Sequence, residues 1–129
     1  FSIIVPTYNN LEYLKLCLKS IEKNSSLNHE IIIFVNDGSD GTLDYLKTQN
    51  YKFKHSKINA GVCIAFNEAV KQATAKYIVL AHDDMYFLPS WDSILKKEIE
   101  LLDTKFFYLS GTMISLFTPS NCVEPPLIL

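Results

Sequence analysis

The chain has 129 residues, of which 48% are hydrophobic, and this predicts a single globular domain with little room for a second. Its 12 Lys and Arg residues against 14 Asp and Glu give a net charge of -2 at pH 7, so no basic surface favours binding of nucleic acid. The hydrophobic runs fall short of the roughly 20 residues that span a membrane, so we expect no transmembrane segment in this sequence.

The first strand and the first helix are expected close to the N-terminus. Residues 2–5 form a β-rich run, and Pro6 should end it because proline cannot donate a hydrogen bond to a sheet ladder. From Leu11 onward, hydrophobic residues recur at helical spacing, with Asn9 or Asn10 available as the N-cap. These patterns predict an amphipathic helix that lies on a sheet.

The middle of the chain repeats this alternation. Residues 30–35 predict a second buried strand, and residues 42–50 predict a short helix. A weaker strand signal lies around residues 51–55. A third helix is predicted to open at residues 59–61, and its apolar face extends to Ala73.

A short apolar run at residues 77–81 ends abruptly in His82, Asp83 and Asp84. Such a run predicts a strand that is buried on both faces, as in a parallel sheet flanked by helices.

The rest of the chain continues the pattern with a predicted helix over residues 91–102 and a β-rich segment over residues 106–117. The whole alternation predicts the α/β class, with a Rossmann-like, doubly wound, mostly parallel sheet and helices on both faces. The 3 cysteines show no C-x-x-C spacing, which favours a reducing compartment.

Acidic residues follow two of the predicted strands. Asp37 and Asp40 come after residues 30–35, and Asp83 and Asp84 come after the apolar run. The carboxyl ends of parallel strands meet at one edge, where open α/β sheets bind ligands. Because Mg²⁺ and Mn²⁺ favour one or two carboxylates together with phosphate oxygens, these acids indicate a cation that bridges to a nucleoside diphosphate.

Other interpretations of the same residues stay open. Acidic pairs after a strand are also typical of turns and helix caps, and residues 37–41 alone have the composition of a turn. A calcium loop is excluded because no Glu stands at the required spacing, and His82 has no partner histidine nearby for a zinc site. Tyr8 is either a stacking platform for a base or a packed loop residue.

Four short segments, taken together, resemble the family 2 glycosyltransferases, whose nucleotide-sugar-binding half has the GT-A fold. In chain order, the matching segments are residues 2–9, 36–42, 59–69 and 77–84. Each segment is weak alone, but their order and spacing match the family.

The resemblance implies a nucleotide-sugar site built from Pro6, Thr7, Tyr8, Asn9, Asp37, Gly38, Asn59, Gly61, Asn67 and Asp83. Thr7 and Tyr8 would contact the base, and Asp37 would accept a hydrogen bond from a uracil-like N–H. Asp83 would lie near the ribose.

The resemblance also implies a metal and a reaction. Asp84 would bind Mn²⁺ or Mg²⁺ on the donor's diphosphate, with His82 as a further candidate ligand, and the metal would stabilise charge on the departing nucleoside diphosphate. The implied reaction transfers a sugar from a nucleotide-diphosphate sugar, a UDP-sugar by preference, to an acceptor hydroxyl with inversion at the anomeric carbon.

The sequence departs from the family pattern at several positions. His82 stands where an acid is common, Asn10 where Glu often follows, and Phe66 where a basic residue often precedes Asn67. An alternative function is therefore a non-catalytic nucleotide-sugar-binding or interaction module of the same fold. A nucleotidyltransferase is disfavoured because no basic, glycine-rich phosphate loop follows the first strand.

The family carries its general base in an acceptor-binding half, and no residue of this chain is a convincing substitute for that base. We therefore expect residues 1–129 to form one donor-binding domain that stops before the acceptor-binding half. The acceptor, whether saccharide, lipid or protein, is left open. The expected location is the cytoplasm, or the cytoplasmic face of a membrane through segments outside this chain.

Overall fold

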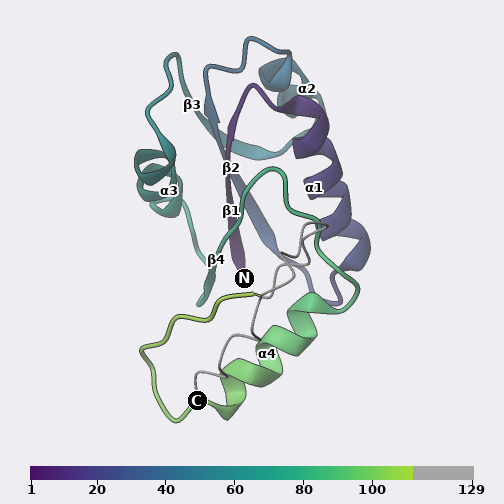
Figure 1. The fold of residues 1–129 in the computed structure, drawn as a ribbon, viewed down its shortest axis with the longest axis vertical. Helices are drawn as coiled ribbons and strands as arrows, with labels where there is room; N and C mark the ends of the chain where they lie inside the picture. The colour runs from purple at the N-terminus through teal and green to yellow at the C-terminus, as the bar shows by residue number, and fades with distance from the viewer. Residues whose placement is uncertain (112–129) are drawn as a thin grey trace, which may run out of the picture.

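The structure, a computed structural model, describes residues 1–111, which form a four-stranded parallel sheet with helices on both faces (Figure 1). The strands lie in the order β3-β2-β1-β4. In chain order the elements are β1 (Ser2–Tyr8), α1 (Leu11–Asn24), β2 (Glu30–Asn36), α2 (Thr42–Gln49), β3 (Lys52–Ser56), α3 (Val62–Val70), β4 (Ile78–Leu80) and α4 (Trp91–Leu101). The predicted α/β class and its alternation of strands and helices are confirmed.

Each face of the sheet has its own hydrophobic core, because successive strand residues point to opposite faces. On one face β1 and β2 pack against α1 and α2, and the fully buried side chains include Ile3, Val5, Ile33, Val35, Leu14, Leu18 and Leu46. On the other face a smaller core packs against α3 and consists of Ile4, Ile32, Phe34, Ala65 and Ala69. The sheet is therefore doubly wound, as predicted.

The winding reverses beside β1. The connections from β1 to β2 and from β2 to β3 place α1 and α2 on one face, whereas α3 carries the chain across the opposite face to β4. Open α/β sheets bind ligands where the strand order reverses, outside the carboxyl ends of the strands. The segments that follow β1 and β4 are therefore where a site is expected.

The prediction that Pro6 ends the first strand is wrong, because β1 continues to Tyr8. The amide of Ser2 donates to Tyr77, and the carbonyl of Ile4 accepts from Ala81, so alternate residues of β1 direct their backbone groups toward β4. By this alternation the backbone nitrogen of Pro6 is directed toward the β4 side of the strand, but it lies beyond the last residue of β4. No strand hydrogen bond is needed from it there, so proline is tolerated.

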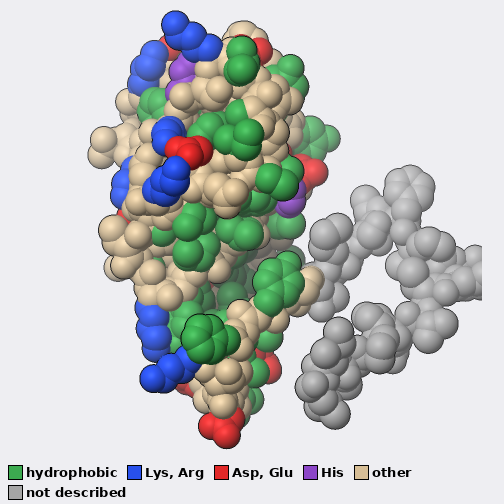
Figure 2. Space-filling view, turned by 90° about the vertical axis from the view of Figure 1, so that its left-hand side faces the viewer, with side chains coloured by type: hydrophobic (Ala, Val, Ile, Leu, Met, Phe, Trp, Pro, Cys, Tyr) green, Lys and Arg blue, Asp and Glu red, His purple; other side chains and the backbone are tan. Residues whose placement is uncertain are grey.

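The prediction that the strand at residues 77–81 is buried on both faces is also wrong. β4 has only three residues, and its Ile78 and Leu80 are 45% and 49% exposed. They lie on the face that α3 covers, but α3 packs against β1 and β2 rather than against β4. Figure 2 views this side of the molecule and shows hydrophobic side chains gathered on its surface.

The chain beyond α4 forms no strand as far as residue 111, and the remainder of the predicted β-rich segment, residues 112–117, lies outside the described residues. Among the helices of the described residues, none combines the length and the hydrophobicity needed to cross a membrane.

Candidate functional site

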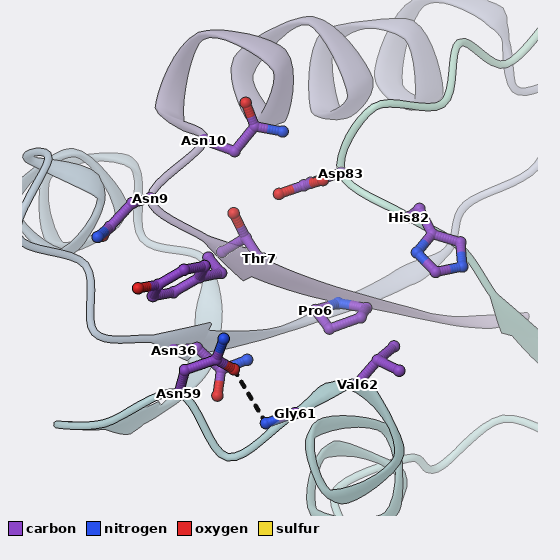
Figure 3. Close-up of a pocket in the computed structure, with 11 residues that line it drawn as sticks. Pro6, Thr7, Asn9, Asn10, Asn36, Asn59, Gly61, Val62, His82 and Asp83 are labelled. Carbon is purple, nitrogen blue, oxygen red and sulfur yellow. Dashed lines mark hydrogen bonds between the residues drawn. The ribbon is translucent and has the colours of Figure 1, made fainter.

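A pocket of about 400 Å³ opens at the carboxyl edge of the sheet, between the end of β1, the start of α3 and the segment after β4 (Figure 3). Its lining comes from all the segments that the strand reversal brings together: Pro6, Thr7, Tyr8, Asn9, Asn10, Asn36, Asn59, Gly61, Val62, His82 and Asp83. The pocket thus lies where the topology predicts a ligand site.

Asn9 connects the loop after β1 to the loop after β2. Its Oδ1 accepts the amide N–H of Gly38 at 3.0 Å, and its Nδ2 donates to Asp37 Oδ2 at 2.9 Å and to Ser39 Oγ at 3.2 Å. Asn9 has φ of 46°, in the left-handed region that asparagine tolerates better than most residues. Tyr8, which precedes it, has a ring 51% exposed at the rim of the pocket.

The turn after β2 requires glycine at position 38. Asp37 and Gly38 have φ of 61° and 80°, and a Cβ on Gly38 would lie 2.8 Å from Val35 and 2.9 Å from Leu43. The Asp37 backbone is further held by β3, since its amide donates to Ser56 at 2.8 Å. This geometry places the Asp37 carboxylate beside the pocket, outside its lining.

Asp40 has a structural role instead of joining the other acids. Its carboxylate accepts from the amide of Leu11 at 2.8 Å and from the amide and hydroxyl of Thr42 at 3.1 and 2.6 Å. It therefore caps the start of α1, where Asn10 makes no side-chain cap. Burial alone would raise the pKa of Asp40, but the hydrogen bonds from Thr42 and Leu11 lower this pKa below its ordinary value.

Thr7 places a hydroxyl in the pocket without a protein partner. The side chain is 3% exposed, and its Oγ1 is the single buried side-chain oxygen or nitrogen of the described residues that makes no hydrogen bond. In Figure 3 this oxygen points toward the space between Asn10 and Asp83. Because buried hydroxyls are nearly always hydrogen-bonded, an orphan at the edge of a pocket indicates a water or ligand group as its partner.

Two asparagines shape the opposite wall of the pocket. Asn36 Oδ1 accepts the amide of Ala60 at 2.9 Å, and Asn59 Oδ1 accepts the amide of Gly61 at 2.9 Å (Figure 3). Gly61 has φ of 82° and directly precedes α3, so the N-terminal end of this helix faces the pocket. The partial positive charge of that end favours an anionic ligand.

Asp83 and Asp84 occupy the central positions of a turn, residues 82–85, which we call the acidic turn. The amide of Met85 donates to the carbonyl of His82 at 3.2 Å and closes it. Asp83 lines the pocket, whereas Asp84 is exposed beside it. Within residues 1–111, no hydrogen bond or ion pair reaches either carboxylate, so both are available to a ligand.

The acidic turn suits Mg²⁺ or Mn²⁺ better than it suits zinc. No group of three or more His, Cys, Asp or Glu side chains among the described residues is arranged to hold a metal, which does not suit zinc. Mg²⁺ or Mn²⁺ would suit the turn, because these ions accept one or two carboxylates and take the remaining oxygens from phosphates and water. The ring of His82 meets that of Phe66 edge-on, with centroids 5.9 Å apart.

The structure brings together most of the predicted site residues, but not all of them. Asp37 and Gly38 lie next to the pocket, while Asp84 and Asn67 are exposed outside its lining. Asn67 is distant because α3 begins at Val62 and carries position 67 beyond its first turn. The predicted residues that line the pocket are Pro6, Thr7, Tyr8, Asn9, Asn59, Gly61, His82 and Asp83.

Three lining residues were not predicted as site residues: Asn10, Asn36 and Val62. Asn36 is the last residue of β2, and Asn10 is the residue immediately before α1. Their position at the carboxyl ends of strands is the signal that could have identified them.

The sequence model described as "Glycosyl transferase family 2" matches residues 2–118. The chain is 33% identical to an uncharacterized glycosyltransferase, YwdF, of Bacillus subtilis over 97% of this chain and 46% of that protein. It is also 33% identical, over 77% of this chain and 32% of that protein, to the dolichyl N-acetyl-α-D-glucosaminyl phosphate 3-β-D-2,3-diacetamido-2,3-dideoxy-β-D-glucuronosyltransferase of Methanococcus voltae. The chain thus spans about half or less of the length of these curated relatives.

Solved structures with the same fold include Staphylococcus aureus TarS, residues 1–349, in complex with UDP-GlcNAc. It aligns with a TM-score of 0.64 and 25% identity, over 77% of this chain and 30% of that one. The mannosyltransferase PcManGT of Pyrobaculum calidifontis, in complex with GDP-Man and Mn²⁺, aligns with a TM-score of 0.67 at 21% identity, over 81% and 32%. The predicted GT-A fold is confirmed by these likenesses. With its fold and most of its length matched, the chain belongs to glycosyl transferase family 2.

Proposed function

We propose that this chain binds the donor of a glycosyl transfer, a nucleotide-diphosphate sugar, in the pocket at the carboxyl edge of the sheet. The observation that carries the proposal is the acidic turn: Asp83 lines the pocket, Asp84 is exposed next to it, and neither carboxylate has a hydrogen bond from the described residues. Family membership supports it, as do similar structures that hold UDP-GlcNAc or GDP-Man.

The protein's side chains provide distinct contacts for such a donor. The half-exposed ring of Tyr8 offers a stacking surface for a base. Asp37 has its Oδ2 occupied by Asn9 and Ser39, which leaves Oδ1 to accept an N–H from a uracil-like base. Guanine also has N–H groups that this acceptor could bind, so our preference for a UDP-sugar rests on the family resemblance and on the similar structure that holds UDP-GlcNAc.

The other end of the donor would meet the acidic turn. Asp83 lies in the pocket, where it would accept hydrogen bonds from ribose hydroxyls, and Asp84 lies on the outer side, where it would hold Mn²⁺ or Mg²⁺. A bound metal would stabilise negative charge on the leaving nucleoside diphosphate. No lysine is among the described residues that line the pocket, so the metal would supply most of the positive charge for the diphosphate, with His82, when protonated, and the N-terminal end of α3 as the other positive groups.

We also propose that residues 1–129 form the donor-binding part of a longer enzyme, which transfers the sugar with inversion to an acceptor hydroxyl through a base outside this chain. The alternative is a donor-binding module without turnover. The contact between Phe66 and His82 favours this alternative, since it places two aromatic rings where the family resemblance implies a basic and an acidic side chain.

Titration calorimetry with UDP tests the proposal. We expect UDP to bind with Mn²⁺ and much more weakly without it, and Asp84→Asn to lose this metal dependence. Asp44→Asn is the matched control, because Asp44 is an exposed acid on α2 that, among the described residues, pairs with Lys47 alone. Metal-dependent binding that survives unchanged in Asp84→Asn would contradict the assignment, and donor hydrolysis with Mn²⁺ in the intact protein separates the enzyme from the module.

A further inference from the structure

The segment that connects β4 to α4, residues 81–90, has no regular secondary structure, yet it carries both carboxylates of the acidic turn. A loop of this kind does not by itself hold two like charges in a fixed position. In the ribbon the segment leaves β4, crosses to α1 and then descends to α4 (Figure 1). Its contacts with α1, together with the packing of His82 against Phe66, therefore help to fix where the acidic turn lies.

Three polar side chains on one side of α1 make these contacts. Cys17, Ser20 and Asn24 are separated by three and four residues, which places them along one stripe of the helix. Cys17 Sγ donates to the carbonyl of His82 at 3.5 Å. The amide of Phe87 donates to Ser20 Oγ at 2.9 Å, and Asn24 Nδ2 donates to the carbonyl of Phe87 at 2.6 Å. We call these three residues the α1 polar stripe.

Ser20 is the central member of the stripe, and its hydroxyl both donates and accepts a hydrogen bond. It donates to the carbonyl of Cys17 in its own helix at 2.7 Å while it accepts from Phe87. The side chain is buried, and serine is a poor residue for a helix interior unless its hydroxyl has partners. Alanine at this position would leave the Phe87 amide without a partner in the same place.

The loop is fastened to α1 on both sides of Phe87. Toward the acidic turn, the carbonyl of His82 accepts both from Cys17 and from the amide that closes the turn. Toward α4, the amide of Ser90 donates to the carbonyl of Asn24 at 2.9 Å, and the rings of Phe87 and Trp91 pack with centroids 4.7 Å apart. The backbone is thus held at intervals, while the two carboxylates remain free of hydrogen bonds from the described residues.

We propose that the α1 polar stripe positions the acidic turn for metal binding, with Ser20 and Asn24 as positioning residues that contact neither the metal nor the nucleotide. The proposal rests on the donor and metal site proposed above. Groups that orient metal ligands from behind affect affinity strongly, because a bound ion tolerates little displacement of its carboxylates.

The test compares Ser20→Ala and Asn24→Ala with Thr48→Ala in the intact protein. Thr48 is the matched control because its hydroxyl also donates to a carbonyl of its own helix, that of Tyr45 at 2.7 Å, but it lies in α2 and does not contact the loop. Free Mn²⁺ is counted by electron paramagnetic resonance at increasing Mn²⁺ concentration with UDP present. We expect Mn²⁺ to bind about tenfold more weakly to the two stripe variants, with Thr48→Ala unchanged.

Two further measurements separate positioning from general loss of structure. UDP binding without metal should be the same in all the variants, since the stripe does not contact the nucleotide pocket. Hydrogen exchange at the Phe87 amide should be faster in Ser20→Ala, while amides of β1 and β2 keep their wild-type rates. This measurement needs no ligand.

The outcomes are distinct. Wild-type Mn²⁺ affinity in both stripe variants would overturn the proposal, and so would an equal fall in metal-free UDP binding, which would show a merely structural role. If the wild-type protein bound no Mn²⁺ with UDP, the proposed donor site would fail and the inference with it. Unchanged hydrogen exchange at the Phe87 amide in Ser20→Ala would contradict the role of the α1 polar stripe and leave the proposed donor site unaffected.

Discussion

The two edges of the sheet use the same kinds of side chain in opposite ways. At the amino edge, where the strands begin, carboxylates are saturated: Glu30 accepts from Ser2 Oγ at 2.6 Å, from the Thr74 amide at 2.9 Å and from Lys52 Nζ at 3.0 Å. At the carboxyl edge, Asp83 and Asp84 have no such partner among the described residues. Glu30 at the first edge stabilises the fold, whereas Asp83 and Asp84 at the second are left free for a ligand. Asp40, which also follows a strand at the carboxyl edge, is the exception, because its carboxylate caps α1.

A second group at the amino edge shows the same saturation. Asp92, at the start of α4, is fully buried and accepts the amides of Ser26 and Leu27 at 2.8 and 2.7 Å. It also lies 2.9 Å from His29 Nε2. Burial lowers the pKa of His29, against the raising effect of Asp92. At the carboxyl edge, by contrast, Thr7 keeps a buried hydroxyl without a protein partner.

The largest expected effect is at Asp92. Asp92→Ala would remove a fully buried carboxylate that accepts the amides of Ser26 and Leu27 and pairs with His29, so we expect the free energy of unfolding to fall by about 3 kcal/mol. Urea denaturation measures it, and Asp44→Ala, at an exposed acid, should change stability by less than about 0.5 kcal/mol. If Asp92→Ala and Asp44→Ala lost similarly little free energy of unfolding, the number of hydrogen bonds that an acid accepts would not predict how much it stabilises the fold.

At the carboxyl edge, Gly38→Ala should lower the free energy of unfolding by about 2–3 kcal/mol, since it adds a clash with Val35 and Leu43 to the strain of positive φ. Gly41→Ala separates the two terms. Gly41 is left-handed, with φ of 94° and ψ of 0°, and the nearest atom to its added Cβ is Leu11 Cδ2 at 3.7 Å, an ordinary contact, so strain alone should reduce stability by about 1 kcal/mol. If thermal or urea unfolding showed equal losses of stability in the two variants, the clash with Val35 and Leu43 would contribute nothing to the loss in Gly38→Ala.

Much of this arrangement was predictable from the sequence, because hydrophobic periodicity is a local property. The runs at residues 2–5 and 30–35 and the helical spacing after Leu11 predict β1, β2 and α1 close to their observed positions. The same local property misjudged β4, since the exposure of Ile78 and Leu80 depends on where α3 packs.

The site was predicted less completely, because its contacts join residues that are distant in sequence. Nothing near Asp40 indicates that it caps α1, 29 residues away, and the pairing of His29 with Asp92 spans 63 residues. The position of Asp37 outside the pocket lining follows from its left-handed backbone, which the turn composition permits but does not specify. Sequence patterns placed the acids at the correct edge and left their individual roles open.

Thr7→Val sharpens the comparison, because it replaces the orphan hydroxyl by a methyl group of similar shape. Stability should be unchanged or higher by up to about 1 kcal/mol, since no protein hydrogen bond is lost, while UDP with Mn²⁺ should bind about tenfold more weakly. The control is Thr42→Val, which removes a buried hydroxyl that donates to Asp40 at 2.6 Å. That variant should lose stability and keep its UDP affinity, and the opposite pattern in either variant would contradict the assignment.

The smallest expected effect is a dependence of stability on pH at the amino edge. The hydrogen bond from Ser2, followed by those from Thr74 and Lys52, lowers the pKa of Glu30 to about 2 from an ordinary value of 4.5. Because the folded state releases this proton more readily than the unfolded chain, Glu30 stabilises the fold fully above pH 4.5, and this contribution is lost as the pH falls toward 2. Allowing for solvent screening, we expect it to amount to about 1 kcal/mol.

Glu30→Gln should therefore lower stability near pH 7 and flatten the stability profile between pH 4.5 and 2, as measured by urea unfolding at a series of pH values. Glu100→Gln is the control, since Glu100 is an exposed acid of α4 whose one ion pair within residues 1–111, with Lys96, spans 3.9 Å. If the stability of Glu30→Gln fell between pH 4.5 and 2 as steeply as that of the wild type, groups other than Glu30 would be responsible for the loss of stability in acid. The same variant should leave UDP binding unchanged at pH 7, because a saturated carboxylate at the amino edge contributes to the fold and contacts no ligand at the opposite edge.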